Sequence, residues 1–222
     1  MILVDRLLVD GISWVDGNLE HYRTWFKAST DKPWLSITAA KKSWPGIRPR
    51  GHFRGEKGAP DAANTRYVLL SAAKMHFSVA LSVLFIARDL DDQSQRRVGM
   101  QQAVDEKQWP FRVVIAWSQP ESEAWYLAGF SPADEDEGGR LGELRGKLGF
   151  DPTCAPHRLS STGRECKKDA KQALRVLSAG DPDRERACLQ EAPLPKLVER
   201  SGASGLADFL NAVRDEVLPL FR

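Results

Sequence analysis

The sequence predicts an α/β fold, with a mostly parallel central sheet flanked by helices and a helical C-terminal extension. Two runs, Val79–Ala87 and Phe111–Trp117, are apolar at successive rather than alternating positions. Such runs are typical of strands that are buried on both faces in the middle of a parallel sheet. Segments with helical spacing of apolar residues precede, separate and follow these two strands, so strands and helices alternate along the chain.

The composition is that of an ordinary soluble globular protein. The chain has 222 residues, of which 28% are charged and 42% hydrophobic, and its net charge is +2. Its three cysteines form no C-x-x-C pair, which favours a reducing cytoplasm over a disulfide framework or a zinc ribbon. We expect no membrane span, because no apolar stretch reaches roughly 18 residues, and no signal peptide, because Asp5 and Asp10 interrupt the first apolar run.

The first elements are predicted in the order strand, helix, loop, helix. Ile2–Val9 is predicted as a strand that ends at Asp10 and Gly11, and Leu19–Lys27 as a helix capped by Asn18. Asp61–His76 is predicted as the next helix, with Asp61 as its cap. Gln93–Lys107 is predicted as the helix between the two buried strands.

Carboxylates follow each predicted strand. The stretch VALSVLFIARDLDD switches from an apolar run to Asp89, Asp91 and Asp92. Glu121 and Glu123 follow the next strand. Ligands in open α/β sheets bind beyond the carboxyl ends of the strands, and a divalent cation would hold such close acids ionised together. The alternatives are a solvated turn for the aspartates and a first helical turn for the glutamates, where the helix dipole favours negative charge. Asp10 is equally open to a metal-ligand and a turn interpretation.

The segment 29–60 carries a local basic excess that the net charge of the whole chain hides. Its basic side chains outnumber its acids between residues 41 and 57, where Glu56 is the one acid. These side chains are Lys41, Lys42, Arg48, Arg50, Arg54 and Lys57. Arginine-rich loops with interspersed aromatic residues suit phosphate backbones, and a solvated irregular loop is the alternative.

The remainder of the chain is predicted to be largely helical. The acidic run 134–137 is interpreted as a solvated loop, and Leu141–Leu148 as a helix stopped by Gly149. Glu165–Leu177 is predicted as a lysine-bearing helix. Leu206–Phe221 carries apolar residues at helical spacing, which indicates a core or partner face rather than a site.

Several of these motifs resemble the toprim family of topoisomerases, primases and metal-dependent nucleases. Asp10-Gly11 stands where toprim proteins carry a Glu-Gly turn after the first strand, and Asp89-Leu90-Asp91 is similar to their later D-x-D. The run from Pro120 to Ala128, PESEAWYLA, resembles the P-E-x-E-A-W-L-L-A run of a bacterial toprim-like family. Overcoming-lysogenization-defect nucleases are more distant relatives, and they add a downstream lysine, for which Lys171 or Lys168 is the candidate.

This resemblance implies a toprim-like α/β domain over residues 1–175, with a basic insertion at about 29–60, and a helical extension over residues 176–222. It implies a metal-dependent nuclease in an anti-phage defence system. Asp10, Asp89, Asp91 and Glu123 would bind Mg²⁺ or Mn²⁺, and Glu121 or Asp92 would orient water. Lys171 would offset transition-state charge, and the basic insertion would bind DNA or RNA. A partner ATPase is also implied.

Two departures from the family pattern keep a second hypothesis open. The acid after the first strand is Asp10 rather than Glu, and Trp14 stands where nucleases often carry a second acid. The chain would then be a catalytically degenerate subunit that binds a partner ATPase or nucleic acid without cleaving it. A small-molecule phosphotransferase is a more distant alternative, since no glycine-rich phosphate loop follows any predicted strand.

Overall fold

The computed structural model of the protein describes residues 1–25, 34–161 and 168–221, and it is a mixed α/β structure that is mostly helical. The chain forms two compact units, each assembled from segments that are distant in the sequence. Unit 1 comprises Met1–Leu7, Ala87–Gln93 and Ala116–Asp215, and unit 2 comprises Leu8–Ile86, Ser94–Ile115 and Glu216–Arg222. The predicted domain boundary at residue 175 falls inside unit 1.

The N-terminal segment is a helix, α1 (Ile2–Gly11), so the predicted first strand is wrong. The apolar residues Leu3, Val4, Leu7 and Leu8 are all buried. They are spaced by one and three residues, which places them on one helical face and would split them between the two faces of a strand. Within unit 1, the Arg6 guanidinium donates to the carbonyl oxygens of Leu189 and Ala192, at 2.5 and 2.6 Å.

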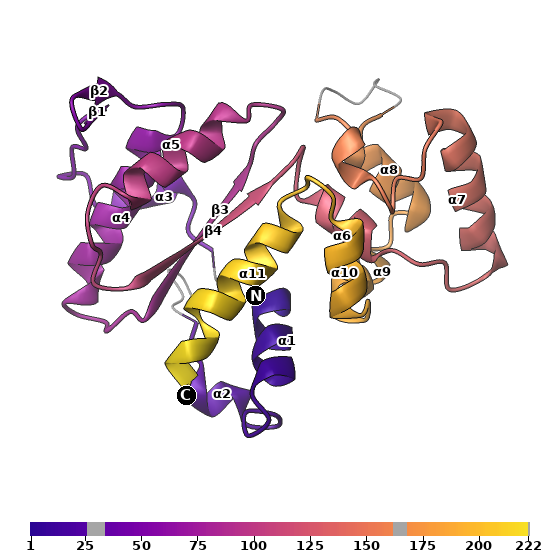
Figure 1. Cartoon of the computed structure of the whole chain (residues 1–222), viewed down its shortest axis with the longest axis horizontal. Coiled ribbons are helices and arrows are strands. Elements are labelled where there is room, and N and C mark those ends of the chain that lie inside the picture. Colours follow the sequence, from indigo (N-terminus) through magenta and orange to yellow (C-terminus); the bar gives the residue numbers. More distant parts are fainter. Residues whose placement is uncertain (26–33, 162–167, 222) are drawn as a thin grey trace. The chain divides into compact units, whose positions relative to one another are not determined.

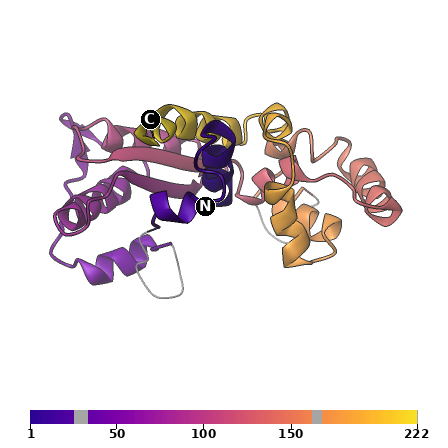
Figure 2. The same cartoon turned by 90° about the horizontal axis from the view of Figure 1, so that it is seen from below.

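Strands β3 (Val83–Asp89) and β4 (Arg112–Ser118) confirm two predicted strands and their parallel pairing (Figures 1 and 2). Arg112 N–H donates to Ser82 O at one end of the pair, and Leu90 N–H donates to Ser118 O at the other, each at 2.9 Å. The sheet has these two strands within the described part of the chain. It is therefore smaller than the central sheet with flanking helices that was predicted, and the residues of β3 are half-buried or exposed, whereas β4 is mostly buried.

Unit 2 surrounds the first halves of these strands with helices and a small hairpin. Its elements are α2 (Leu19–Tyr22), α3 (Ile37–Ser43), β1 (His52–Phe53), β2 (Glu56–Lys57), α4 (Ala62–His76), α5 (Gln95–Val104) and η2 (Leu218–Phe221). Helices α4 and α5 lie side by side (Figure 1). They confirm the helices predicted at 61–76 and 93–107. The helix predicted at 19–27 is a single turn, α2, and residues 26–27 lie outside the described ranges.

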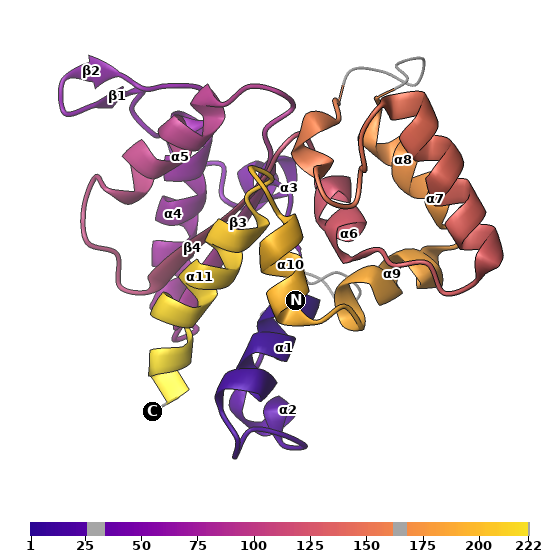
Figure 3. The same ribbon diagram turned by 45° about the vertical axis from the view of Figure 1, so that its right-hand side comes forward.

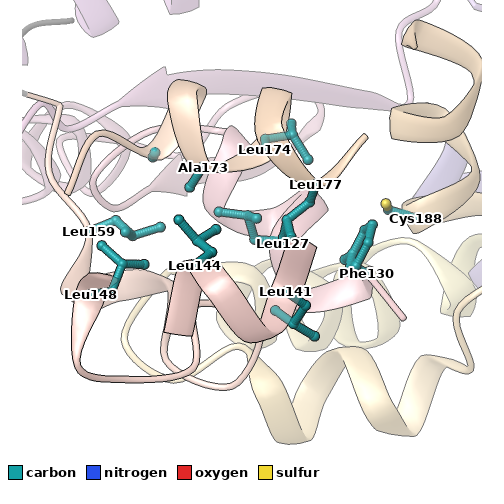
Figure 4. Close-up of a cluster of buried hydrophobic side chains, with 11 residues drawn as sticks. Leu127, Phe130, Leu141, Leu144, Leu148, Leu159, Ala173, Leu174, Leu177 and Cys188 are labelled. Carbon is teal, nitrogen blue, oxygen red and sulfur yellow. The ribbon is translucent and has the colours of Figure 1, made fainter. Parts of the chain in front are cut away.

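Unit 1 is built around helix α6 (Glu123–Gly129), against which α8, α9 and α10 pack (Figure 3). Its further elements are α7 (Glu135–Leu148), η1 (Pro156–Arg158), α8 (Ala170–Leu177), α9 (Pro182–Gln190), α10 (Leu194–Arg200) and α11 (Leu206–Glu216). Leucines of α6, α7 and α8 meet in one apolar cluster around Leu127 and Phe130, both fully buried (Figure 4). This core fixes the helix that carries Glu123 and the helix that carries Lys171.

The acidic run 134–137 begins helix α7 and is not a loop. Asp134 caps the helix, because its side chain accepts a hydrogen bond from Glu137 N–H at 2.7 Å. Glu137 is 5% exposed. Gly149 ends α7 with a φ of 75°, as the glycine at that position predicts. The later helix predicted at 165–177 is α8, capped by Asp169, and residues 165–167 lie outside the described ranges.

The C-terminal region is helical, as predicted, and comprises α9, α10, α11 and η2. The apolar stripe of α11 is buried: Leu206, Phe209, Leu210 and Val213 are each at most 6% exposed. This stripe is therefore core. Among the described helices, none is both long and apolar enough to cross a bilayer.

Candidate functional site

The turn after β3 has an unusual backbone. Asp91 and Asp92 have φ values of 49° and 60°, a left-handed region that non-glycine residues seldom adopt. Leu90, which is 2% exposed, anchors the turn, and Asp91 N–H donates to Pro120 O at 3.0 Å. Strained backbone of this kind persists only where the surroundings hold it, and it concentrates at functional sites. The D-x-D therefore lies in a fixed turn at the carboxyl end of β3, as predicted.

Asp89 binds the segment that follows β4. Its Oδ1 accepts hydrogen bonds from Ser118 Oγ at 2.6 Å and from Ser122 N at 2.9 Å. Ser118 ends β4, and Ser122 immediately precedes α6. These two bonds tie the ends of the two strands together.

Glu121 is buried and pairs with Lys171. Its side chain is 4% exposed, and its Oε2 lies 2.5 Å from Lys171 Nζ, whereas the lysine side chain is 62% exposed. The pKa of Lys171 is raised, first because of this bond to Glu121 and then because Glu123, Glu121 and Asp89 attract the ammonium. A buried carboxylate without a counter-ion is costly, and Lys171 supplies that counter-ion.

Glu123 belongs to the same electrostatic cluster. Burial raises its pKa; its own backbone hydrogen bond and the charge of Lys171 oppose this, and the negative charges of Glu121 and Asp89 add to it. Ser122 Oγ donates to Glu123 Oε2 at 3.3 Å. Asp89, Glu121, Glu123 and Lys171 thus interact in unit 1, and we name these four residues the acidic cluster.

Asp92 is held by two other segments of unit 1. Gln119 Nε2 donates to its Oδ1 at 2.8 Å. Ser161 donates to its Oδ2 through its Oγ at 3.1 Å and through its N–H at 3.3 Å. The Asp92 carboxylate therefore links the segments that follow β3, β4 and η1.

Two of the four predicted metal ligands, Asp89 and Glu123, belong to the acidic cluster. Asp10 is exposed in the last turn of α1 and belongs to unit 2, and Asp91 is exposed in the β3 turn. Across the described ranges, no three His, Cys, Asp or Glu side chains are grouped so that they could hold a metal ion. Glu121 is occupied by the Lys171 ammonium, and Oδ1 of Asp89 by two hydrogen bonds. These residues, as they are arranged, do not fit a Mg²⁺ ion, which prefers an octahedral shell of oxygens.

The basic segment of unit 2 is anchored by a buried arginine, Arg66 of α4. Arg66 is 5% exposed. Its Nε lies 2.6 Å from Glu106 Oε2, and its two terminal nitrogens donate to the carbonyl oxygens of Arg50 and His52. Its guanidinium also lies over the Phe53 ring, 3.5 Å from the centroid. One side chain therefore fixes the loop between α3 and the β1–β2 hairpin.

The six predicted basic residues lie on three adjoining stretches of this segment and are all exposed. Lys41 and Lys42 end α3, Arg48 and Arg50 lie in the loop, and Arg54 and Lys57 lie in the hairpin. Two of them have local partners: Lys41 Nζ donates to Asn64 Oδ1 at 3.0 Å, and Arg54 donates to the carbonyl oxygen of Asp105 at 3.2 Å. Arg54 also borders an open cavity of about 740 Å³ whose charges are mixed, with Glu56, Arg97, Asp105 and Glu106 on its wall.

Sequence reasoning missed the residues that orient these side chains. Ser118, Ser122 and Ser161 bind the aspartates, but isolated serines in a sequence carry no signal for such a role. Arg66 had a signal: it stands four residues after Ala62 and three before Leu69, which places a charged residue on the buried face of α4. Such a residue needs several partners, and Arg66 has them.

Comparison with known proteins gives no family for this chain. Neither protein-family models, nor curated proteins, nor solved structures match it. The toprim resemblance therefore stays a prediction that rests on the motifs quoted above.

Proposed function

We propose that this chain is a nucleic-acid-binding subunit of toprim-like type that binds its substrate without cleaving it and acts with a partner ATPase. The observation that carries the proposal is the Lys171–Glu121 contact of 2.5 Å. A positive charge from the chain itself, Lys171, already pairs with one of the acids that follow β4. Basic residues that could contact phosphates are meanwhile presented on an anchored loop.

The basic segment supplies the physical means of binding. Lys42, Arg48, Arg50 and Lys57 are exposed, and the carbonyl bonds from Arg66 hold the backbone of their loop in one conformation. Cations that neutralise phosphates release counter-ions from the nucleic acid, so the affinity depends steeply on salt. An anchored loop loses less conformational entropy on binding than a mobile one.

The binding test compares charge removal at two places. We expect the triple variant Lys42→Ala/Arg48→Ala/Arg50→Ala to bind fluorescently labelled DNA or RNA at least about tenfold more weakly than the wild type, with a salt slope that is smaller by about 0.9 per lost phosphate contact. The matched control is Lys147→Ala/Arg158→Ala/Arg186→Ala, which removes three exposed basic side chains from unit 1. Equal loss in both triple variants would show that only the net charge matters and would refute this interface.

The second test addresses the cation. Calorimetric titration of the wild type with millimolar Mg²⁺ or Mn²⁺, with and without nucleic acid, is expected to show no stoichiometric binding. Copurification from cells that express the neighbouring genes would identify the ATPase. A stoichiometric metal that requires Asp89 would contradict the non-cleaving function.

A metal-dependent nuclease is the second candidate, and the acidic cluster is the observation that favours it. Asp89, Glu121 and Glu123 interact at the carboxyl ends of β3 and β4, the place where α/β proteins bind ligands. A metal would have to displace Lys171 from Glu121. The test is nicking of plasmid DNA or cleavage of RNA in Mg²⁺ or Mn²⁺ by the wild type and by Asp89→Ala/Asp91→Ala. Activity that is lost in the variant supports the nuclease, and equal activity in both excludes it.

A further inference from the structure

Two aromatic residues of the basic segment, Phe53 and Trp44, pack against core clusters of unit 2. Phe53 is 6% exposed and packs in a core cluster beneath the Arg66 guanidinium. Trp44 packs against a second cluster formed by Ala40, Ile47 and Tyr67. Its carbonyl oxygen also accepts a hydrogen bond from the Tyr67 hydroxyl at 2.5 Å.

The charged residues of the same segment have the opposite orientation. Phe53 is buried while its neighbour Arg54 is exposed, and Ile47 is 8% exposed while Arg48 is exposed. In the hairpin, Arg54 and Gly55 form the two-residue turn with φ values of 50° and 90°, so Arg54 lies at the tip of a paired ladder. The result is a surface with cationic groups on which no Phe, Tyr or Trp ring between residues 41 and 57 is fully exposed, and His52 is its one exposed ring.

We infer that this surface recognises the phosphate backbone of an intact duplex and does not bind unstacked bases. The inference rests on the proposed nucleic-acid binding and specifies its substrate class. Proteins that bind single strands combine a basic groove with aromatic side chains on which successive bases stack. The basic segment has the cations, whereas its Phe53 ring is buried and its Trp44 ring is half-buried against a core cluster.

The charge density of the two substrates leads to the same preference. A duplex carries one phosphate charge per roughly 1.7 Å of its axis, twice that of one of its strands, so a purely cationic surface gains more from a duplex. Stacking on aromatic rings would compensate a single strand for its lower charge density. The rings of Phe53 and Trp44 do not provide this stacking, because they pack against the core clusters of unit 2. Binding should then be independent of base sequence, because phosphate contacts carry no sequence information.

The experiment measures the affinity of the full chain for a labelled duplex and for each of its two separated strands over a range of salt concentrations. We expect the duplex to bind at least about fivefold more tightly than either strand at every salt concentration, with a steeper salt slope of about −0.9 per phosphate contact against about −0.7 for single strands. A scrambled duplex should bind equally well. Tighter binding of a single strand at low and high salt overturns the inference.

Trp34 provides a second, independent measurement. It precedes α3 and is 50% exposed, so a base could reach its ring. We expect Trp34→Ala to leave both affinities within a factor of two, and its exposed position should spare the fold. A loss of fivefold or more for the single strand alone would overturn the inference. If the wild type binds neither substrate, the proposed function itself fails, whereas single-strand preference leaves that function intact and removes only the substrate class.

Discussion

Two buried glutamates of unit 1, Glu137 and Glu121, pair with cations that differ in chemical type and in exposure to solvent. Glu137 is bound at both carboxylate oxygens by Arg184, at 2.7 and 2.8 Å, and its Oε2 also accepts Ala133 N–H. Arg184 is itself 19% exposed. Glu121 is as deeply buried, but its cation is the single ammonium of Lys171, whose side chain is 62% exposed.

The difference indicates which pair is structural and which is available for function. The guanidinium of Arg184 binds both carboxylate oxygens of Glu137 and is mostly buried, so another cation has no open route by which to replace it. Accordingly, the pKa of Glu137 is lowered, chiefly by its hydrogen bonds from Arg184. An exposed lysine is a point charge on a flexible chain, so a phosphate could draw it away from Glu121, and a metal ion or a basic side chain of a partner could replace it. The Glu137–Arg184 pair fixes α7 to α9, whereas the Glu121–Lys171 pair is the one that a ligand can open.

Breaking the enclosed pair should have the largest effect. We expect Arg184→Met to lower the free energy of unfolding by about 3 kcal/mol, because it leaves a buried carboxylate without its cation. Urea unfolding measures this loss. Adding Glu137→Gln to the variant should restore most of the stability, since the uncompensated charge is then removed. A loss below about 0.5 kcal/mol would show that the pair contributes no more than a surface ion pair.

Breaking the open pair should cost less. We expect Lys171→Met to lower the free energy of unfolding by about 1 kcal/mol, because Glu121 stays buried while the lost partner was mostly in solvent. Millimolar Mg²⁺ should restore part of this loss in the variant and leave the wild type unchanged. Lys168→Met is the control, since it removes an exposed lysine of the same region whose side chain was the alternative to Lys171. If the two variants lose the same stability, Lys171 is not the counter-ion of Glu121.

The smallest effect concerns Glu123 and pH. Burial raises the pKa of Glu123 above its ordinary value of 4.5, so the folded state holds this proton more tightly than the unfolded state does. Its contribution to stability is therefore fully present below pH 4.5 and is lost as the pH rises through the raised pKa. We expect Glu123→Gln to gain stability relative to the wild type between pH 4 and pH 7, as measured by thermal unfolding. A difference that does not change with pH would contradict this assignment.

A helix or strand could be predicted from the sequence where its local residue pattern agreed with its tertiary environment. Apolar runs predicted the strands β3 and β4, and helical spacing predicted the helices α4, α5 and α8. A C-terminal glycine predicted the end of α7 at Gly149. Ile2–Val9 was mistaken for a strand because a short apolar run fits both periods, and only the burial of Leu3, Val4, Leu7 and Leu8 on one face distinguishes them. The acidic run was mistaken for a loop because its charges suggested solvent, whereas Arg184, distant in the sequence, allows Glu137 to be buried.

The sequence by itself determined that acids follow β3 and β4 and that cations concentrate between residues 41 and 57, because both are properties of neighbouring residues. Only the tertiary structure decided that Lys171 pairs with Glu121, that Asp10 lies on a helix, and that Phe53 lies beneath Arg66. Each of these depends on how distant segments pack, and a buried charge or ring can be identified as a partner only once the fold has placed the atoms around it.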